Sequence, residues 1–201
     1  MLKKNLKKQK IKKKKRNYFL PGFSLGEVLL SVFILASVLT VAVGLIAGDL
    51  RYMINSQDRV IASGLAQEGI ELVMNIRDNN WEKGNGAFEN GFPNDSSYNQ
   101  IINYDSNSLE SGSRKNKLNI NNNNFYTHNS GTETKFQRKI IVNYYQNGSS
   151  INSKNNADEA EIFSVVIWGN SFPSGTSINE SNCNASTKCA FAKVTLTKWN
   201  G

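Results

Sequence analysis

Few residues in this chain of 201 have types and spacing that could carry out chemistry. Its two cysteines, Cys183 and Cys189, enclose five residues, and its one histidine, His128, follows shortly after a run of four asparagines. A Cys/His zinc site needs two ligands more than the cysteines supply, and a catalytic cysteine needs His128, which has no ordering signal around it. The sequence contains no glycine-rich phosphate loop and no nucleophile with a suitably spaced base. We therefore predict that the protein is not an enzyme and uses no metal or cofactor.

Acidic residues offer two further possibilities. Glu68 and Glu71 lie about one turn apart on a predicted helix, but no histidine is near them, so we expect them to be solvated. Glu27 stands at the start of a long apolar segment, where an unpaired carboxylate costs about 2 to 3 kcal/mol and usually has a partner or a function. The alternative is that Glu27 only reaches the polar interface near the helix start, where the helix dipole also favours an acid.

The segment that follows Glu27 is apolar from Val28 to Ala47, 20 residues without a charge. At about 1.5 Å per residue it spans roughly 30 Å, the thickness of the hydrocarbon core of a bilayer. A buried core helix is the alternative, but core helices are seldom apolar on all sides for so long. We therefore predict that residues 28–47 cross a membrane.

The basic charge of the chain is concentrated before this segment. Of 24 Lys and Arg, ten lie in residues 1–22, which contain no acid. The other 14 are outnumbered by 16 Asp and Glu, so the rest of the chain has a formal charge of −2. This balance argues against a large basic face that would bind nucleic acid. Because basic flanks stay cytoplasmic, we predict the N-terminus inside the cell and residues from 50 onward outside the membrane.

The junction between the basic and the apolar segment carries a specific motif. Residues 22–30 read Gly-Phe-Ser-Leu-Gly-Glu-Val-Leu-Leu, so a basic leader ends at Gly22, Phe23 follows, and Glu27 is the fifth residue after the glycine. This pattern resembles the prepilin motif of type IV pilins and type II secretion pseudopilins. Gly26 replaces the Ile or Val that is common before the Glu, a departure that leaves the cleavage residues unchanged.

The resemblance implies processing and assembly. A prepilin peptidase would cut after Gly22, remove the leader 1–22 and methylate the new amino-terminal Phe23. The amine of Phe23, from the same chain or a neighbour, would then be the partner of Glu27. The implied partners are other pilin or pseudopilin subunits, an assembly ATPase and its inner-membrane platform, and the product is a pilus or pseudopilus at the cell surface.

A second segment, LAQEGIELVMNIRDNNW at 65–81, also resembles the corresponding helical region of minor pilins and pseudopilins, a less specific match that favours a minor subunit. The alternative function is an uncleaved, membrane-anchored extracytoplasmic binding or adhesion module whose Asn-rich head holds a surface ligand. Retention of residues 1–22 would distinguish this anchor from a processed subunit.

Beyond the membrane half, residues 23–50, the pattern predicts that the helix continues through an amphipathic half, residues 51–82. No proline interrupts residues 24–78, so the two halves can form one helix of about 55 residues, or roughly 80 Å. Asp78-Asn79-Asn80 is expected to end it. Five apolar residues at intervals of 7, 4, 7 and 4 predict a single apolar stripe: Ile54, Ile61, Leu65, Leu72 and Ile76.

Residues 83–201 are predicted to form a loop-rich head with a C-terminal antiparallel sheet. The part from 83 to 135 is rich in Asn, Ser and Gly and is expected to consist mainly of turns. Three strand-length runs follow, 136–145, 161–168 and 190–199, rich in β-branched and aromatic residues. The predicted fold class is α+β, with the long N-terminal helix, transmembrane and then amphipathic, packed on this small sheet.

The predicted location of the head decides how we interpret the cysteines. Thiols outside the cell membrane tend to be oxidised, so a disulfide between Cys183 and Cys189 is favoured over a metal site or a catalytic cysteine. Closing this small loop before the last strand would contribute about 2 kcal/mol by the loop-entropy estimate. Pilins of the family often close a C-terminal loop in this way, which agrees with the resemblance.

Overall fold

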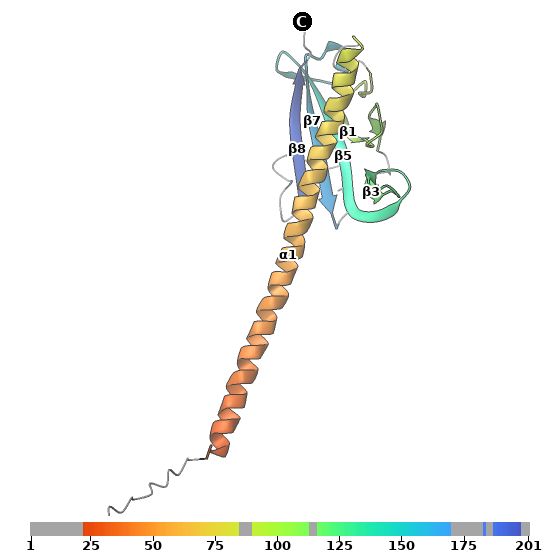
Figure 1. Ribbon diagram of the computed structural model, residues 1–201. Helices are drawn as coiled ribbons and strands as arrows, with labels where there is room; N and C mark the ends of the chain where they lie inside the picture. Colours follow the sequence, from red (N-terminus) through yellow and green to blue (C-terminus); the bar gives the residue numbers. More distant parts are fainter. Residues whose placement is uncertain (1–21, 85–89, 113–115, 170–182, 184–186, 198–201) are drawn as a thin grey trace, which may run out of the picture. The chain divides into compact units, whose positions relative to one another are not determined.

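The fold class predicted from the sequence is confirmed by a computed structural model, which describes residues 22–84, 90–112, 116–169, 183 and 187–197. A long apolar N-terminal helix packs on a small antiparallel sheet, an α+β arrangement consistent with a pilin-like fold (Figure 1). The chain divides into two compact units between Asp49 and Leu50. The helix contributes to both units, and its contacts with the sheet belong to the second.

Helix α1 spans Leu25–Glu82 without a break. The predicted stop at residues 78–80 is wrong, because these residues form part of the last turns of the helix. Asn80 is buried there, and its side-chain amide donates a hydrogen bond of 2.5 Å to the carbonyl of Asn90, so a residue that usually ends helices is satisfied within one. Gly84, at a φ of 71°, follows the helix and provides the left-handed residue that commonly ends one.

The face of α1 that packs on the sheet differs from the predicted stripe. Leu65 and Ile76 are buried as expected, whereas Ile54 is 56 % exposed. The buried face is rotated by roughly 70° from the predicted stripe, at 3.6 residues per turn. The pattern of large apolar residues missed this rotation because alanine and glycine supply much of the contact. The buried residues are Asp58, Ala62, Leu65, Ala66, Gly69, Ile70, Val73, Ile76 and Asn80.

All strand pairs in the sheet are antiparallel. Strand β5 is central: β7 pairs along one edge from Phe136 to Tyr145, and β3, β1 and β6 share the other edge. Strand β8 pairs with β7, while β2 and β4 extend β1 and β3. The strands are β1 (Ser97–Ile101), β2 (Glu110–Ser111), β3 (Lys117–Ile120), β4 (Tyr126–Thr127), β5 (Thr132–Gln146), β6 (Ser149–Ile151), β7 (Glu159–Trp168) and β8 (Cys189–Thr197).

The three predicted strands correspond to β5, β7 and β8, although residues 198 and 199 of the last lie outside the described part of the chain. The prediction for residues 83–135 needs correction, because β1 to β4 and the first residues of β5 lie within it. Of these short strands, β1 and β3 pair through backbone groups with the edge of β5, and β2 and β4 pair with β1 and β3. Few apolar side chains are required for this pairing, so the Asn-rich composition conceals the strands. Asn147 and Gly148, both at positive φ, form the turn from β5 to β6.

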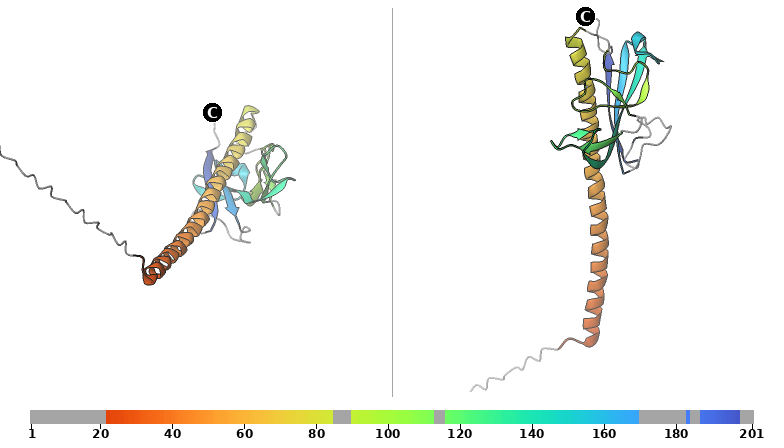
Figure 2. Two further views of the ribbon diagram at one scale, coloured as in Figure 1. Left: turned by 60° about the horizontal axis from the view of Figure 1, so that its bottom comes forward. Right: turned by 90° about the vertical axis from the view of Figure 1, so that its right-hand side faces the viewer.

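The main apolar core lies between α1 and one face of the sheet, which Figure 2 shows as two layers. Val73 and Ile76 of the helix pack with Ile140 and Ile162 of the sheet at one end, and Leu65 packs in the cluster at the other. A smaller cluster lies on the opposite face of the sheet, since successive side chains of a strand alternate between faces. The two cysteines belong to that smaller cluster.

Gly69 is the point of closest approach between the helix and the sheet. An added Cβ at this position would lie 2.2 Å from Ser164 Oγ, 3.1 Å from Ser164 Cβ and 3.2 Å from Arg138 Cδ. Even if the serine hydroxyl rotated away, the other two contacts would be tight, and Ser164 or Arg138 would have to shift by a few tenths of an ångström. The absence of a side chain is therefore what lets α1 approach β7 and β5 at this level.

We predict that Gly69→Ala lowers the free energy of unfolding by about 1 to 3 kcal/mol, because overpacking forces the helix away from the sheet. Gly64→Ala is the matched control, since nothing lies within 4 Å of an added Cβ there. In this exposed helical position alanine should raise the stability by up to about 1 kcal/mol. Denaturant unfolding of the full chain in detergent measures both variants, and equal effects would contradict the close approach.

Candidate functional site

Of the residues singled out in the motif, Glu27 lies in the first turn of α1, and Gly22 and Phe23 lie just before it. Ser24 precedes the helix, and its hydroxyl accepts a hydrogen bond of 3.2 Å from the N–H of Gly26, while its carbonyl accepts one of 3.0 Å from the N–H of Glu27. Ser24 is thus the N-cap and Glu27 is the third helical residue. The spacing Ser-x-x-Glu is a known helix-start signal that sequence reasoning passed over. It places Glu27 where the helix dipole favours a negative charge.

Gly22 and Phe23 lie just before this cap, outside the helix. Phe23 is 82 % exposed, and among the described residues nothing beyond the chain neighbours of Gly22 lies within 4 Å of the position that its Cβ would take. The peptide bond between them is therefore in a non-helical, accessible stretch that a protease can bind in extended form. The leader 1–21 lies outside the described residues, so the structure places Gly22, Phe23 and Glu27 only.

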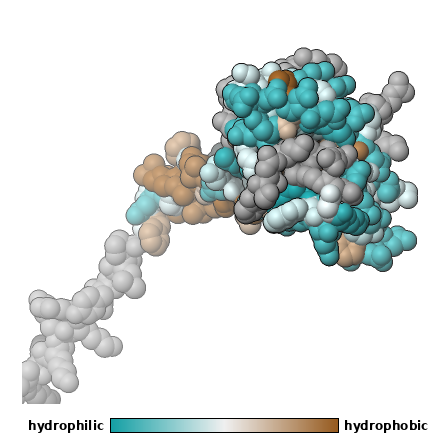
Figure 3. Space-filling view, turned by 90° about the horizontal axis from the view of Figure 1, so that it is seen from above, coloured by the Kyte–Doolittle hydropathy of each residue, from teal (hydrophilic) through white to brown (hydrophobic). Residues whose placement is uncertain are grey.

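The apolar segment after Glu27 is exposed along its length. From Val28 to Ala47 every side chain is exposed except Ala42, which is half-buried, so the segment is not a core helix of this chain. It is long and apolar enough to cross a membrane and lies near the N-terminus, which fits a single-pass membrane anchor. In the space-filling view the head surface is mainly hydrophilic and the helix segment hydrophobic (Figure 3).

The few hydroxyl groups in this segment do not disturb its apolar character. Ser31 donates to the carbonyl of Val28, Ser37 to that of Phe33 and Thr40 to that of Ala36, each at 2.8 to 2.9 Å. These bonds stay within the helix, so the hydroxyls need no water. A lipid environment tolerates polar groups that are satisfied in this way.

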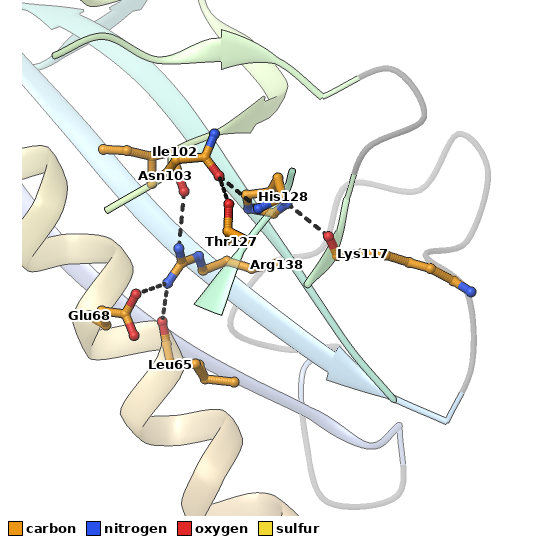
Figure 4. A network of polar contacts seen from close by, with 8 residues as sticks. All are labelled: Leu65, Glu68, Ile102, Asn103, Lys117, Thr127, His128 and Arg138. Atoms are coloured by element: carbon orange, nitrogen blue, oxygen red, sulfur yellow. Dashed lines mark hydrogen bonds and ion pairs between the residues drawn. The ribbon is translucent and has the colours of Figure 1, made fainter. Parts of the chain in front are cut away.

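In the head, a buried arginine joins α1 to the sheet. Arg138 of β5 has no exposed surface, and its Nη1 donates to Glu68 Oε1 at 3.0 Å and to the carbonyl of Leu65 at 3.2 Å (Figure 4). Its Nη2 donates to the carbonyl of Ile102 at 3.0 Å. Burial lowers the pKa of Arg138, and the nearby carboxylate of Glu68 opposes that shift. Glu68, considered above as a metal ligand, is instead the counter-ion of this guanidinium.

A second set of hydrogen bonds continues from Ile102 through Asn103. The buried Oδ1 of Asn103 accepts bonds from Thr127 Oγ1 at 3.0 Å and from the His128 N–H at 2.7 Å. The His128 ring is buried as well, with Nδ1 3.1 Å from the carbonyl of Lys117 (Figure 4). The expectation that nothing orders His128 is therefore corrected: its order comes from a residue 25 positions earlier in the chain.

The predicted disulfide is present between Cys183 and Cys189, whose Cα atoms are 5.1 Å apart. Both residues are buried in the smaller apolar cluster, against Ile141, Val165 and Ile167 of the sheet. His128 belongs to the network around Asn103, so the structure does not combine it with a thiol. Within the described ranges, no group of three or more His, Cys, Asp or Glu residues could hold a metal ion.

Comparison with family models, with curated proteins and with solved structures finds no match in any of the three. The functional argument therefore depends on the motif at residues 22–27 and on the geometry of this chain. Of the candidate site residues, Gly22 and Phe23 precede the helix, Glu27 lies in its first turn, and the cysteine pair lies in the head.

We predict that replacing both cysteines by serine lowers the free energy of unfolding by about 2 kcal/mol, because the unfolded chain loses a loop constraint. Denaturant unfolding measures the difference, and reduction of the parent protein should have the same effect while leaving the double variant unchanged. Peptide mapping without reduction should recover Cys183 and Cys189 in one cross-linked product. Quantitative alkylation of both thiols in freshly isolated native protein would show the pairing to be wrong.

Proposed function

We propose that this protein is a structural subunit of a type IV pilus or a type II secretion-like pseudopilus. In this proposal a prepilin peptidase processes it, and packing of its N-terminal helices assembles it. The observation that carries the proposal is the start of α1, where an accessible Gly22–Phe23 bond precedes a capped helix. The first turn of this helix has one acid, Glu27, and an exposed apolar segment follows it. The prepilin resemblance and this geometry concern the same six residues.

The physical task of such a subunit is to exchange lipid for protein around the helix. The exposed apolar side chains from Val28 to Ala47 are satisfied in a membrane, and moving them into water would be costly. If the corresponding helices of neighbouring subunits replace the lipid, the segment never meets water. Assembly then requires packing between copies of this chain and no chemical turnover.

Glu27 has a defined electrostatic role in this scheme. Cleavage after Gly22 creates a positive amine on Phe23, next to a helix N-terminus whose dipole repels a cation. The carboxylate of Glu27, in the first turn, supplies the opposite charge. In a bundle of apolar helices an isolated charge of either sign is costly, whereas the pair offsets much of that cost. Cleavage and assembly are thereby coupled, because the uncut chain has no amine at this place.

The partners implied by this function are a prepilin peptidase, an assembly ATPase with its inner-membrane platform, and other pilin or pseudopilin subunits. The head would lie outside the membrane, where its disulfide is stable, and then at the surface of the fibre. The lower-specificity resemblance at residues 65–81 supports a minor subunit. The second candidate function, an uncleaved anchor for a binding head, is supported by the same exposed apolar helix and differs only in retaining residues 1–22.

We predict that Gly22→Val leaves the precursor uncut, because the peptidase reads the glycine at the end of the leader. Gly26→Val is the matched control: an added Cβ there makes only an ordinary contact of 3.6 Å with Ser24 Oγ, so this variant should be processed. Intact mass and N-terminal sequencing of the protein from its native host report the result. Normal processing of Gly22→Val would refute the proposed cleavage, and retention of the leader by the unaltered protein would favour the anchor.

We predict that Glu27→Ala still inserts in the membrane but enters fibres at least about tenfold less, since the Phe23 amine is left without its counter-charge. Asp49→Asn is the control, because it removes an acid from the other end of the apolar segment. The measurement is the ratio of subunit in sheared fibres to subunit in membranes. Equal incorporation of the Glu27 variant and the parent would show that this carboxylate is only an interfacial residue.

A further inference from the structure

Two aromatic rings form an exposed pair on the head. Tyr104 and Phe125 stack with their centroids 4.9 Å apart and 25° between their planes, and they are 41 % and 52 % exposed. Among the described residues that follow α1, Tyr98 is the only other large apolar side chain so exposed. Stacking removes part of each ring from water, and the apolar area that stays exposed is available to another molecule.

The two loops that carry the rings are tied together below them. The buried Oδ1 of Asn103 accepts hydrogen bonds from Thr127 and His128 (Figure 4). Tyr104 directly follows Asn103 in the sequence, and Phe125 precedes Thr127 by two residues. These bonds join segments that lie 24 and 25 residues apart in the sequence. The hydrogen bonds of Asn103 therefore hold together the two chain segments that carry the rings.

The run of asparagines before Phe125 also contacts the aromatic pair, through the side chain of Asn121. Asn121 Oδ1 accepts hydrogen bonds from the backbone N–H groups of Asn123 at 3.0 Å and Phe125 at 2.9 Å, and Asn121 Nδ2 donates to the Tyr104 hydroxyl at 3.4 Å. Asn124 takes a positive φ of 63°, which asparagine tolerates better than most residues. The rings are thus preorganised, and a ligand that binds them would lose little to ordering of the loop.

We propose that the Tyr104–Phe125 pair, with the exposed amides of residues 122–124, binds a neutral sugar ring of a carbohydrate. Flat aromatic rings suit the apolar C–H face of a hexopyranose, and asparagine amides both donate to and accept from its hydroxyl groups. Residues 121–124 and both rings carry no charge, which matches an uncharged ligand. A nucleic acid strand would also stack on the rings but needs a basic groove, and the chain after residue 22 has a net charge of −2.

This binding site does not rest on cleavage or assembly of the chain. The aromatic pair lies in the head, more than 50 residues beyond the apolar segment, and its supporting bonds involve head residues alone. Sugar binding and pilus function can therefore fail or succeed separately. A sugar-binding head would suit either a fibre subunit or a membrane anchor.

The experiment uses the full chain in detergent micelles with three neutral probes: cellotetraose, maltotetraose and chitotetraose. Calorimetry should show binding of at least one probe with a Kd of about 1 mM or tighter. Phe125→Leu and Tyr104→Leu keep apolar bulk but remove a flat ring, and each should weaken binding at least about fivefold. Tyr98→Leu, which removes an exposed ring outside the pair, is the matched control and should change the Kd by less than about twofold.

Thermal unfolding of each variant verifies that the head stays folded, which is expected because both rings are about half exposed. The proposal is overturned if none of the three probes binds at a concentration of about 10 mM, ten times the expected Kd. It is also overturned if both leucine variants bind as tightly as the parent, because the rings would then not be the contact. Binding of single-stranded oligothymidine in place of the sugars, lost in the same variants, would assign the pair to nucleic acid.

Discussion

The buried guanidinium of Arg138 is the interaction on which the rest of the head depends. A cation without exposed surface is tolerated only if its hydrogen bonds are made and a counter-charge is near. For the two terminal nitrogens, Glu68 and the carbonyl of Leu65 meet these needs from the helix, and the carbonyl of Ile102 does so from the segment after β1. The buried Nε has no hydrogen-bond partner among the described residues. The helix is consequently held in one rotation and one register against β5.

That register has consequences in two directions. Along the helix it places Gly69 against Ser164, where an added methyl group would not fit, and it directs the small residues Ala62 and Ala66 toward the sheet. Away from the helix, the bond to Ile102 continues through Asn103 to the loops that carry the aromatic pair. The buried Arg138 thus contacts both the helix and the segment that leads to the Tyr104–Phe125 pair.

The burial of α1 differs between its first and its second part. Its buried residues begin at Asp58, which forms an ion pair of 2.5 Å with Lys135, and continue to Asn80. No side chain from residue 22 to residue 57 is buried in this chain, so the apolar segment is free to meet lipid or other helices. The part of α1 from Asp58 onward therefore packs on the head of the same chain, and the part before it is exposed, as the proposed fibre subunit requires.

The sequence alone determined the features that depend on neighbouring residues: the apolar segment, the continuous helix, the three long strands, the motif at residues 22–27 and the close cysteine pair. Each is a local pattern of hydrophobicity, charge or spacing. Only the tertiary structure decided which face of the helix is buried, where His128 lies, and that Tyr104 meets Phe125. These features depend on contacts between distant segments, such as the bond from Arg138 to Leu65 across 73 residues, and no local pattern encodes such a contact.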